Sequence, residues 1–370
     1  MITRSFCFIR HSTYFCGVKN IDYIIAGQGI AGSLLAWFLL QRSQRVLVID
    51  PEEVNTSSRI SGGMIHPVTG RRIAKSWMAD TLIPYARTTY TDIEDKLAGR
   101  FFEDYPVLEI FNDIQHRNDW AGRSADEGMD KYIKDECPPN AIPEGINAPY
   151  GGRWVVGGGW LDTKRFLDAI RQYLKGKNSY LNGTLDFYDA EKTESGIQWK
   201  EYSAKAIIDC TGMGLYKSDY GTDLPFNPCT GELLNINVEG LPKDFVVHGS
   251  IKIIPTGGTG YICGATYDYT RRDGQCTVDG REKLESSIQK LISRPYSITQ
   301  QLAAVRPSTT DRKPIIGTHF SNEKYYFFNG LGSKGVMMGP WHAIMLVKHL
   351  LEETEIPEEY RPYRGKLVNW

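Results

Sequence analysis

The chain has 370 residues, of which 41% are hydrophobic and 24% charged, a composition that is typical of globular proteins and excludes disorder over most of the length. The length favours two domains. The net charge of −1 gives no electrostatic footprint for a nucleic acid or an anionic membrane. Seven cysteines without a C-x-x-C pair indicate reduced thiols and a cytoplasmic location, and no apolar run is long enough to span a membrane.

The first patterned segment is a strand, a helix and a second strand. Residues 1–20 are basic and contain no acid, and we expect a disordered extension or, alternatively, an organellar presequence. The apolar run 22–26 predicts a buried strand, 30–41 a helix, and 45–49 a second strand. Such a βαβ unit implies a parallel sheet.

The rest of the chain alternates between helical and β-rich patterns. We expect helices over 73–96 (interrupted near Pro84), 163–174 (with Asp162 as N-cap), 281–291 and 336–351. We expect strands over 185–190, 197–199, 204–209, 233–238, 246–254, 260–265 and 325–328, and β-rich or irregular structure over 102–111 and 141–156.

These elements predict an α/β fold. Because strand–helix units stand at both ends and a β-rich stretch lies between them, we expect a discontinuous, Rossmann-like dinucleotide-binding domain with an inserted β-rich α+β domain. The dinucleotide-binding domain is assigned to residues 21–75, 152–222 and 305–370. The inserted domain is assigned to 76–151 and 223–304.

The turn after the first strand matches the dinucleotide fingerprint G-x-G-x-x-G. Gly27 allows the tight turn, Gly29 leaves room for a pyrophosphate, and Gly32 lets the helix pack closely. Asp50, at the end of the second strand, can accept hydrogen bonds from ribose hydroxyls, which disfavours NADP; the fingerprint does not separate NAD from FAD. The alternative is a glycine-rich turn without a ligand. Candidate ligand-binding residues are Gly27, Gly29, Ile30, Ala31, Gly32 and Asp50.

Five short segments occur in an order that resembles a known family. They are the fingerprint with Asp50; Ser57-Ser58-Arg59-Ile60-Ser61-Gly62-Gly63-Met64; Ile207-Ile208-Asp209-Cys210-Thr211-Gly212; Gly264-Ala265-Thr266; and Val305-Arg306-Pro307 through Gly317, followed by 329–335. From about residue 21 to its end, the chain resembles the FAD-dependent oxidoreductases that include glycine oxidase, sarcosine oxidase and D-amino-acid oxidase.

The resemblance implies non-covalent FAD. The turn 330–335 would meet the pyrimidine end of the flavin ring, where a helix N-terminus and Lys334 stabilise negative charge at N1 and C2=O. The alternative for Lys334 is a solvated surface position. Cys210 is expected to be a small buried residue without a redox role. Further cofactor contacts are implied for Ser58, Gly62, Gly63, Met64, Thr211, Gly212, Gly330, Gly332, Ser333, Gly335 and Val336.

The resemblance also places residues at the substrate. Arg306 would pair with a substrate carboxylate, or would instead order its loop through Asp311 or a carbonyl group. Lys252 stands where related oxidases carry a tyrosine, which suits a substrate with a second acid; Tyr267 and Tyr269 could replace the missing hydroxyl. The oxygen-activating lysine of sarcosine oxidase has no clear counterpart.

His66 and a short cationic cluster have two interpretations each. His66 could act as a base beside the flavin or serve as a hydrogen-bonded structural residue. Arg71, Arg72 and Lys75 could attract an acidic substrate or form a solvated face.

The expected activity is oxidation of the C–N bond of a small amine or amino acid. Hydride would pass to flavin N5, the imine would hydrolyse, and O₂ or another acceptor would reoxidise the flavin. One alternative is a tRNA wobble-uridine carboxymethylaminomethyl oxidase, although the neutral charge disfavours nucleic acid. Another is a non-catalytic flavin-binding protein. Catalytic or substrate roles are assigned to Arg306, His66, Lys334 and Lys252, and no metal is expected.

Overall fold

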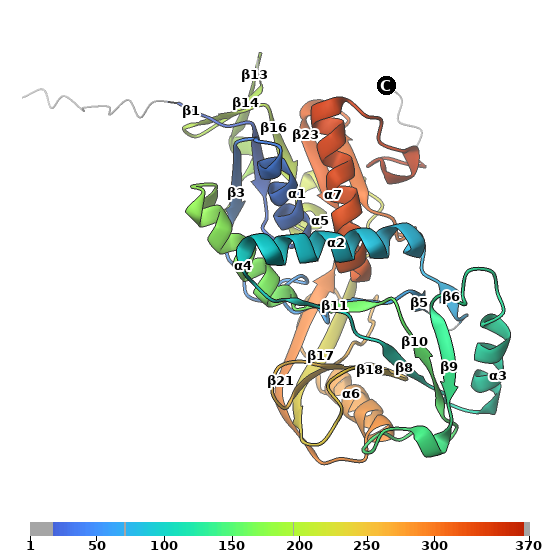
Figure 1. Cartoon of the computed structure of the whole chain (residues 1–370). Helices are drawn as coiled ribbons and strands as arrows, with labels where there is room; N and C mark the ends of the chain where they lie inside the picture. Colours follow the sequence, from blue (N-terminus) through green and yellow to red (C-terminus); the bar gives the residue numbers. More distant parts are fainter. Residues whose placement is uncertain (1–17, 70–71, 195, 366–370) are drawn as a thin grey trace, which may run out of the picture.

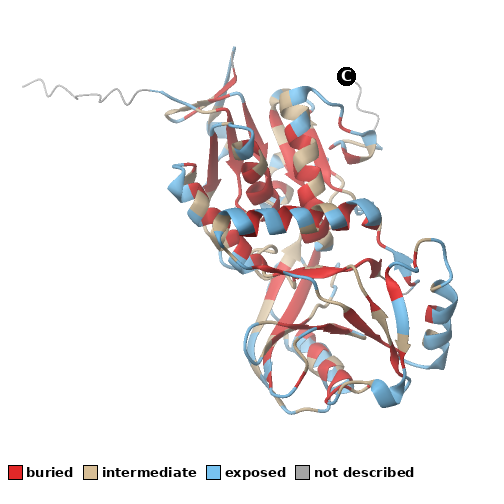
Figure 2. Cartoon of the chain, viewed as in Figure 1, coloured by how far each residue is buried: buried red, intermediate tan, exposed pale blue. Residues whose placement is uncertain are grey.

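The computed structural model describes residues 18–69, 72–194 and 196–365. These residues form two parts, one built on a six-stranded sheet and one on an eight-stranded sheet (Figure 1). The central strands of the two sheets and the inner faces of the helices are buried, whereas the outer helix faces and several edge strands are partly exposed (Figure 2). Within the described residues, no helix is both long enough and apolar enough to cross a membrane.

The six-stranded sheet has the order β12-β3-β2-β16-β23-β22. All neighbours are parallel except β23 and β22. Helix α1 (Ile30–Gln41) connects β2 to β3, which confirms the expected βαβ unit. The strands span β2 Tyr23–Ala26, β3 Val46–Asp50, β12 Tyr180–Asn182, β16 Ala206–Asp209, β22 Ile315–His319 and β23 Asn322–Asn329.

Four helices cover one face of this sheet. Helix α1 is apolar on nearly every side because α4 and α7 pack against it, and α2 lies across α7 (Figure 1). Helix α4 begins where expected, since Asp162 Oδ1 accepts a hydrogen bond from the Arg165 amide at 3.0 Å. The other helices span α2 Ala79–Leu97, α4 Thr163–Gly176 and α7 Gly335–Glu352.

A small sheet of order β1-β15-β14-β13 covers the other face. Ile197 and Trp199 of this sheet pack against Ile24 and Leu47 of the six-stranded sheet. Because β1 pairs with β15, residues 19–20, which were expected to belong to the extension, are part of this sheet; residues 1–17 lie outside the described residues. The strands span β1 Lys19–Asn20, β13 Ala190–Thr193, β14 Gly196–Trp199 and β15 Tyr202–Ala204.

The eight-stranded sheet has the order β21-β17-β20-β19-β18-β8-β10-β9 and is antiparallel except between β18 and β8. Helix α6 (Val278–Leu291) packs on one face through a second apolar core, and α3 (Ile114–Arg123) lies outside β9 (Figure 1). The strands span β8 Val107–Ile110, β9 Ile133–Cys137, β10 Gly152–Val155, β17 Cys229–Val238, β18 Val246–His248, β19 Lys252–Pro255, β20 Gly260–Gly264 and β21 Tyr296–Arg306.

The other face of this sheet is turned toward the dinucleotide-binding part. Ile254 of β19 meets the loop of residues 61–63, since a Cβ added at Gly62 would lie 3.3 Å from its Cδ1 atom. The remaining short elements are β4 Met64–Ile65, β5 Val68–Thr69, β6 Ala74–Lys75, β7 Phe102–Glu103, β11 Gly159–Leu161, α5 Met213–Lys217, η1 Pro139–Ala141, η2 Phe187–Asp189, η3 Asp219–Gly221, η4 Gly332–Lys334 and η5 Glu358–Tyr360.

Several segments differ from the sequence expectations, among them helix α3 and strand β21, which were not expected. Helix α2 begins at Ala79 rather than at residue 73, because residues 74–75 pair as strand β6. The helix also continues through Pro84, where an interruption was expected. The stretch expected as a strand over 185–190 contains η2, since Asp186 caps a tight turn through the Tyr188 amide. Residues 152–155, which were grouped with the dinucleotide-binding domain, form β10 of the eight-stranded sheet.

Candidate functional site

Of the three fingerprint glycines in the turn between β2 and α1, two stand where no other residue type fits. Gly27 has φ +93°, and a Cβ there would lie 2.7 Å from the Cys210 carbonyl oxygen. A Cβ on Gly32 would lie 1.9 Å from the Gly27 carbonyl oxygen, so α1 could not approach β2. At Gly29 the Cβ would meet only Ser58, with Oγ at 3.0 Å. Gly29 therefore leaves room beside the helix N-terminus, as a pyrophosphate requires.

Asp50 and Ser58 flank this turn. Asp50 Oδ2 accepts a 2.7 Å hydrogen bond from the Gln28 amide, and Oδ1 accepts one from the Glu52 amide at 2.9 Å. Oδ1 also accepts a longer bond from Arg171 Nη2 at 3.5 Å, whereas Oδ2 has capacity for another donor, so a ribose hydroxyl can still be bound. Ser58 Oγ accepts from the Ile30 amide at 3.1 Å, at the start of α1. Both side chains thus lie beside the fingerprint turn, and their cofactor contacts stay predictions.

Gly63 and the end of β16 have internal structural reasons for their residue types. Gly63 has φ +65°, and a Cβ there would lie 1.9 Å from the Leu161 carbonyl oxygen. Thr211 donates its amide and hydroxyl to Asp209 Oδ1 at 2.8 and 2.7 Å. The Thr211 hydroxyl is therefore engaged inside the protein. Gly212 is tied to the end of β23, since Asn329 Nδ2 donates to its carbonyl oxygen at 3.1 Å.

The turn at 330–335 lies beside the fingerprint turn. A Cβ on Gly335 would lie 3.2 Å from Ile30 Cγ2, and one on Gly339 would lie 2.7 Å from Leu34 Cδ1. The N-termini of α7 and α1 are therefore adjacent, with buried Ala31 and Val336 close to this contact. One extended dinucleotide can reach both turns.

Lys334 is half-buried and bonded to hydroxyl groups. Its Nζ atom donates to Ser76 Oγ at 3.1 Å and to Thr69 Oγ1 at 3.4 Å. Burial lowers the pKa of Lys334, and the charges of Arg312 and Lys252 lower it further. Among the described residues, no carboxylate forms an ion pair with it. Neighbouring Ser333 is exposed.

Arg306 ends β21 on the face that is turned toward the 61–63 loop. Its Nη1 and Nη2 atoms donate to the Thr266 carbonyl oxygen at 3.2 and 3.3 Å, and the guanidinium lies 4.4 Å from the centre of the Tyr267 ring. Asp311 pairs with Arg364 instead. A further Nη1 hydrogen points to Cys229 Sγ at 3.8 Å. Within the described chain, Arg306 forms no ion pair with a carboxylate, and two of its five N–H donors remain for a ligand.

Lys252 lies on the same sheet face. It stands directly opposite Gly264 on one side and His248 on the other. Lys252 is half-buried, and its positive charge contributes to the lowered pKa values of both His66 and Lys334, so its ammonium group lies near both.

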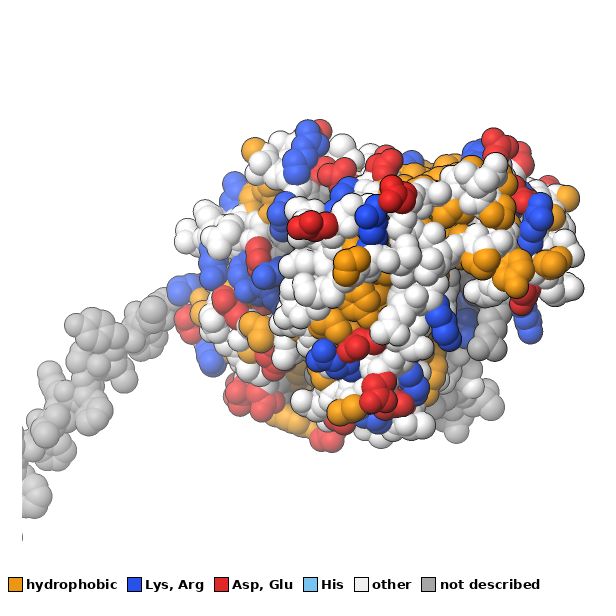
Figure 3. Space-filling model, turned by 90° about the horizontal axis from the view of Figure 1, so that it is seen from below, with side chains coloured by type: hydrophobic (Ala, Val, Ile, Leu, Met, Phe, Trp, Pro, Cys, Tyr) orange, Lys and Arg blue, Asp and Glu red, His pale blue; other side chains and the backbone are white. Residues whose placement is uncertain are grey.

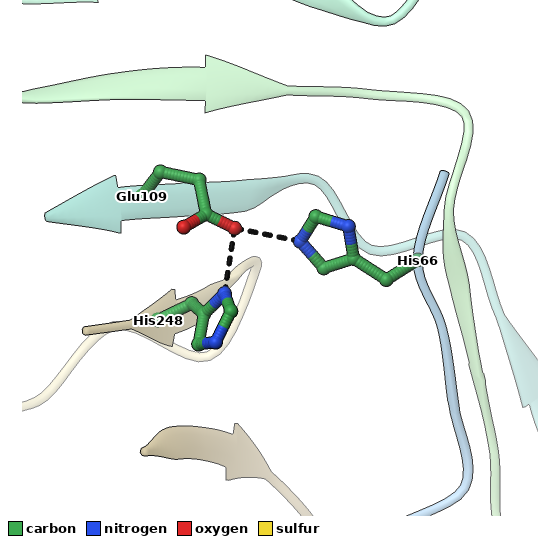
Figure 4. Close-up of side chains that lie close together, drawn as sticks. All are labelled: His66, Glu109 and His248. Atoms are coloured by element: carbon green, nitrogen blue, oxygen red, sulfur yellow. Dashed lines mark hydrogen bonds and ion pairs between the residues drawn. The ribbon is translucent and has the colours of Figure 1, made fainter. Parts of the chain in front are cut away.

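His66, Glu109 and His248 form a hydrogen-bonded cluster (Figure 4). The Val68 amide donates to His66 Nδ1 at 3.1 Å, so the proton of the neutral ring is on Nε2, which lies 2.7 Å from Glu109 Oε1. His248 Nδ1 lies 2.6 Å from the same oxygen. The cluster joins the chain after β4 to strands β8 and β18.

Burial controls the charge of this cluster. It lowers the pKa of His66 to about 4, although Glu109 opposes the shift. Burial alone would raise the pKa of Glu109, but the two histidines outweigh it and the net pKa is below its usual range. One nitrogen or oxygen atom from each of the three side chains lies within 4.8 Å of the others, and two histidines with a glutamate could bind a metal ion. Their mutual hydrogen bonds already account for the arrangement, however. The positive charge of nearby Lys252 also opposes the binding of a further cation.

The cationic cluster after His66 is only partly described. Arg71 lies outside the described residues, Arg72 is exposed, and Lys75 pairs with Asp80 at 2.8 Å. Cys210 is buried, and burial raises its pKa well above the usual value, which keeps it a neutral thiol.

Comparison with known proteins decides the family. Residues 22–349 match the family described as FAD dependent oxidoreductase, the D-amino-acid oxidase family. The chain belongs to this family. It is 26% identical to glycine oxidase of Bacillus licheniformis over 95% of this chain and 99% of that protein. It is 20% identical to the tRNA 5-methylaminomethyl-2-thiouridine biosynthesis bifunctional protein MnmC of Marinobacter nauticus, of which it spans 55% of the length.

Solved structures show the same fold. Iminodiacetate oxidase from Chelativorans sp. BNC1 superposes with a TM-score of 0.77, 17% identity, and coverage of 92% of this chain and 99% of that one. Glycine oxidase from Geobacillus kaustophilus gives 0.77 and 16%, covering 94% and 99%. The predicted FAD-binding α/β fold is thereby confirmed, and the protein is an FAD-dependent amine or amino-acid oxidase or dehydrogenase.

Sequence reasoning missed several residues of this FAD-dependent oxidoreductase. Glu109 and His248 lie in segments read only as β-rich, and no motif linked them to His66. Ser76 and Thr69, which hold Lys334, follow the 61–64 segment by a few residues and carry no recognisable spacing. The one usable signal was a pair of polar residues, Glu109 and His248, each inside an otherwise apolar strand.

Proposed function

We propose that this FAD-dependent oxidoreductase oxidises the C–N bond of a small amine or amino acid between the 61–64 loop and the facing side of the eight-stranded sheet. The observation that carries the proposal is Arg306, a half-buried guanidinium on that face without a carboxylate partner among the described residues. Its similarity to glycine oxidase supports the amino-acid class of substrate.

The residues of the two adjacent helix N-termini fit non-covalent FAD. Gly29 leaves the open position beside α1, and Asp50 lies at the end of β3 for the ribose. When bound, FAD would supply a two-electron acceptor, so that an amine can be oxidised to an imine, which water then hydrolyses. The residues that we propose for its binding are Gly27, Gly29, Ile30, Ala31, Gly32, Asp50, Ser58, Gly62, Gly63, Met64, Thr211, Gly212, Gly330, Gly332, Ser333, Lys334, Gly335 and Val336.

Arg306 binds and orients the substrate. A planar guanidinium can donate two parallel hydrogen bonds to a carboxylate, which fixes the direction of the adjacent C–H bond as well as the affinity. The Thr266 carbonyl and the Tyr267 ring hold the guanidinium in one place before substrate arrives. This fixed orientation lets a single charged group place the reacting carbon.

Lys334 and His66 support the site in different ways. Lys334 would add positive charge at the N-terminus of α7, which would stabilise negative charge on a cofactor held there. His66 is buried and both of its ring nitrogens have protein partners. We therefore assign His66 the positioning of the 66–69 segment, which carries Thr69 against Lys334, rather than the removal of a substrate proton.

An anaerobic flavin-reduction screen tests the proposal. The holoenzyme is mixed with glycine, sarcosine, proline, D-amino acids and N-alkyl amino acids, and the flavin absorbance is followed. We expect at least one of these compounds to bleach the flavin. If none does, although FAD is bound, the protein is a non-catalytic flavin-binding protein and the proposal is wrong.

The MnmC relatives favour one second candidate, oxidation of a glycine-like group on a tRNA wobble uridine. The chain spans about half the length of these relatives. On the face shown in Figure 3, acidic and basic side chains of the described residues are interspersed, and no broad basic stretch is seen. Titration with tRNA at two salt concentrations decides between the candidates, because phosphate contacts weaken steeply with salt.

A further inference from the structure

Three cations converge on the substrate side of the cofactor site. Arg306, Lys252 and Lys334 are all half-buried, and no carboxylate of the described chain pairs with any of them. The nearest acid on that sheet face, Glu109, is taken up by His66 and His248. The site therefore holds more positive charge than the protein itself neutralises.

The sheet register shows how two of these cations are arranged. Gly231 lies against the Arg306 guanidinium, since a Cβ there would be 2.1 Å from Nη2. Gly231 and Leu233 share a face of β17, Leu233 is opposite Gly264 of β20, and Gly264 is opposite Lys252 of β19. The Arg306 guanidinium, which lies over Gly231 of β17, and Lys252 of β19 are thus on one face. They are two strand spacings, about 10 Å, apart across the sheet and offset by two residues along it. Gly264 adds no side chain between them.

A charge that is removed from water needs a partner, and two of the cations already have one under the proposed function. Arg306 takes the substrate carboxylate, and Lys334 serves the cofactor end of the site. Lys252 remains. Its flexible four-carbon side chain can carry the ammonium group over Gly264, which has no side chain, toward the same substrate. The planar guanidinium of Arg306 is less adaptable.

We propose that the preferred substrate is an amino acid with a second carboxylate, bound by Lys252 while Arg306 binds the first. This inference rests on the proposed function, because it assigns the substrate class of that same site. The rival arrangement, in which both cations hold one carboxylate, predicts no preference for diacids and is decided by the same experiment.

The test compares substrates that differ by one carboxylate. Iminodiacetate is paired with sarcosine, and aspartate with alanine in both enantiomers. The ratio of reduction rate to dissociation constant is measured anaerobically for the holoenzyme. The diacid of at least one pair should be preferred tenfold or more, and Lys252→Met should lower that preference at least tenfold. Lys252→Arg should restore part of it, and Lys283→Met on exposed α6 should leave it unchanged.

Two results would overturn the inference. One is equal or better use of the monoacid in every pair by the unmodified enzyme, and the other is an unchanged diacid preference in Lys252→Met that still binds FAD. If no amine reduces the flavin, the proposed function fails instead. Calorimetric titration of the holoenzyme with succinate and butyrate then tests the role of Lys252. If Lys252 binds a second carboxylate, succinate should bind more tightly than butyrate, and Lys252→Met should remove the difference.

Discussion

Arg306 owes its proposed role to what it does not contact. Two of its N–H groups bond to one carbonyl oxygen, which leaves a permanently charged group without a counter-ion among the described residues. The sequence leaves open whether this arginine binds a substrate or orders its loop through Asp311 or a carbonyl group. Asp311 pairs with Arg364 instead, whereas the bonds of Arg306 to the Thr266 carbonyl oxygen match the second part of that alternative. Only the three-dimensional arrangement of the two arginines could exclude the pairing with Asp311.

Replacing Arg306 tests this residue directly. Arg306→Ala should raise the dissociation constant of an amino-acid substrate about 10- to 100-fold, because hydrogen bonds to a charged group contribute about 1.5–3 kcal/mol. Stopped-flow flavin reduction over a range of substrate concentrations gives this constant. Arg294→Ala, which removes an exposed pair with Glu144, is the control and should match the unmodified enzyme. An unchanged constant in Arg306→Ala would remove the carboxylate role.

Gly29 provides a second test at the residue scale. Gly29→Val should leave the protein folded but without FAD, because the side chain would fill the space beside the α1 N-terminus that the pyrophosphate needs. The measurement is the ratio of flavin to protein absorbance after purification, with the melting temperature as a check of folding. Gly122→Val, where a Cβ meets nothing within 4 Å, is the control. Full FAD content in Gly29→Val contradicts the assignment of this turn.

At the scale of elements, local signals predicted α1 and α4 well. The fingerprint glycines and the Asp162 cap are read from residues that contact one another within a few positions. Helix α2 was predicted to start too early because the Ser76 contacts that fix β6 come from distant residues, namely the Pro67 and His66 carbonyl groups. The His66, Glu109 and His248 cluster escaped prediction for the same reason, since the pairing of β18 with β8 brings His248 beside Glu109 and the chain after β4 brings His66 to them.

Helix α7 carries a buried titratable group whose effect on stability can be measured. His342 Nδ1 lies 2.7 Å from the Met338 carbonyl oxygen, and Nε2 has no hydrogen-bond partner in the part of the chain that the structure describes. Burial lowers the pKa of His342 to about 4, below the value of about 6.5 in the unfolded chain. The unfolded state therefore binds the proton first as the pH falls, and folding stability is lost between about pH 6.5 and pH 4.

His342→Leu should remove this loss. Between pH 7 and pH 5, the free energy of unfolding of the variant should decrease by about 2 kcal/mol less than that of the unmodified protein. Urea unfolding at the two pH values measures the difference, with His349→Leu near the C-terminal end of the same helix as the comparison. Since His66 shifts in the same direction, a residual slope is expected. A slope identical to that of the unmodified protein would show that His342 does not titrate in this range.

For the whole molecule, the order of elements was enough to predict the α/β fold, and the family match confirms it. The domain boundaries stay a prediction. The pairing of β10 with β8 and β9, and the packing of α2 across α7, show that chain order does not separate the two parts as simply as the sequence suggested. The residue pattern cannot show which sheet a segment joins, because a buried strand has the same apolar composition in either sheet.

The central claim is that a substrate carboxylate, held by Arg306, presents an amine to bound FAD. It is tested most directly by anaerobic flavin reduction with amino acids and their carboxamides, for example glycine against glycinamide, which share the C–H and amine groups but differ in the negative charge. The account predicts that an acid of the panel bleaches the flavin at least tenfold more efficiently than its amide. Equal rates for acid and amide throughout, or no bleaching by any pair, would contradict it.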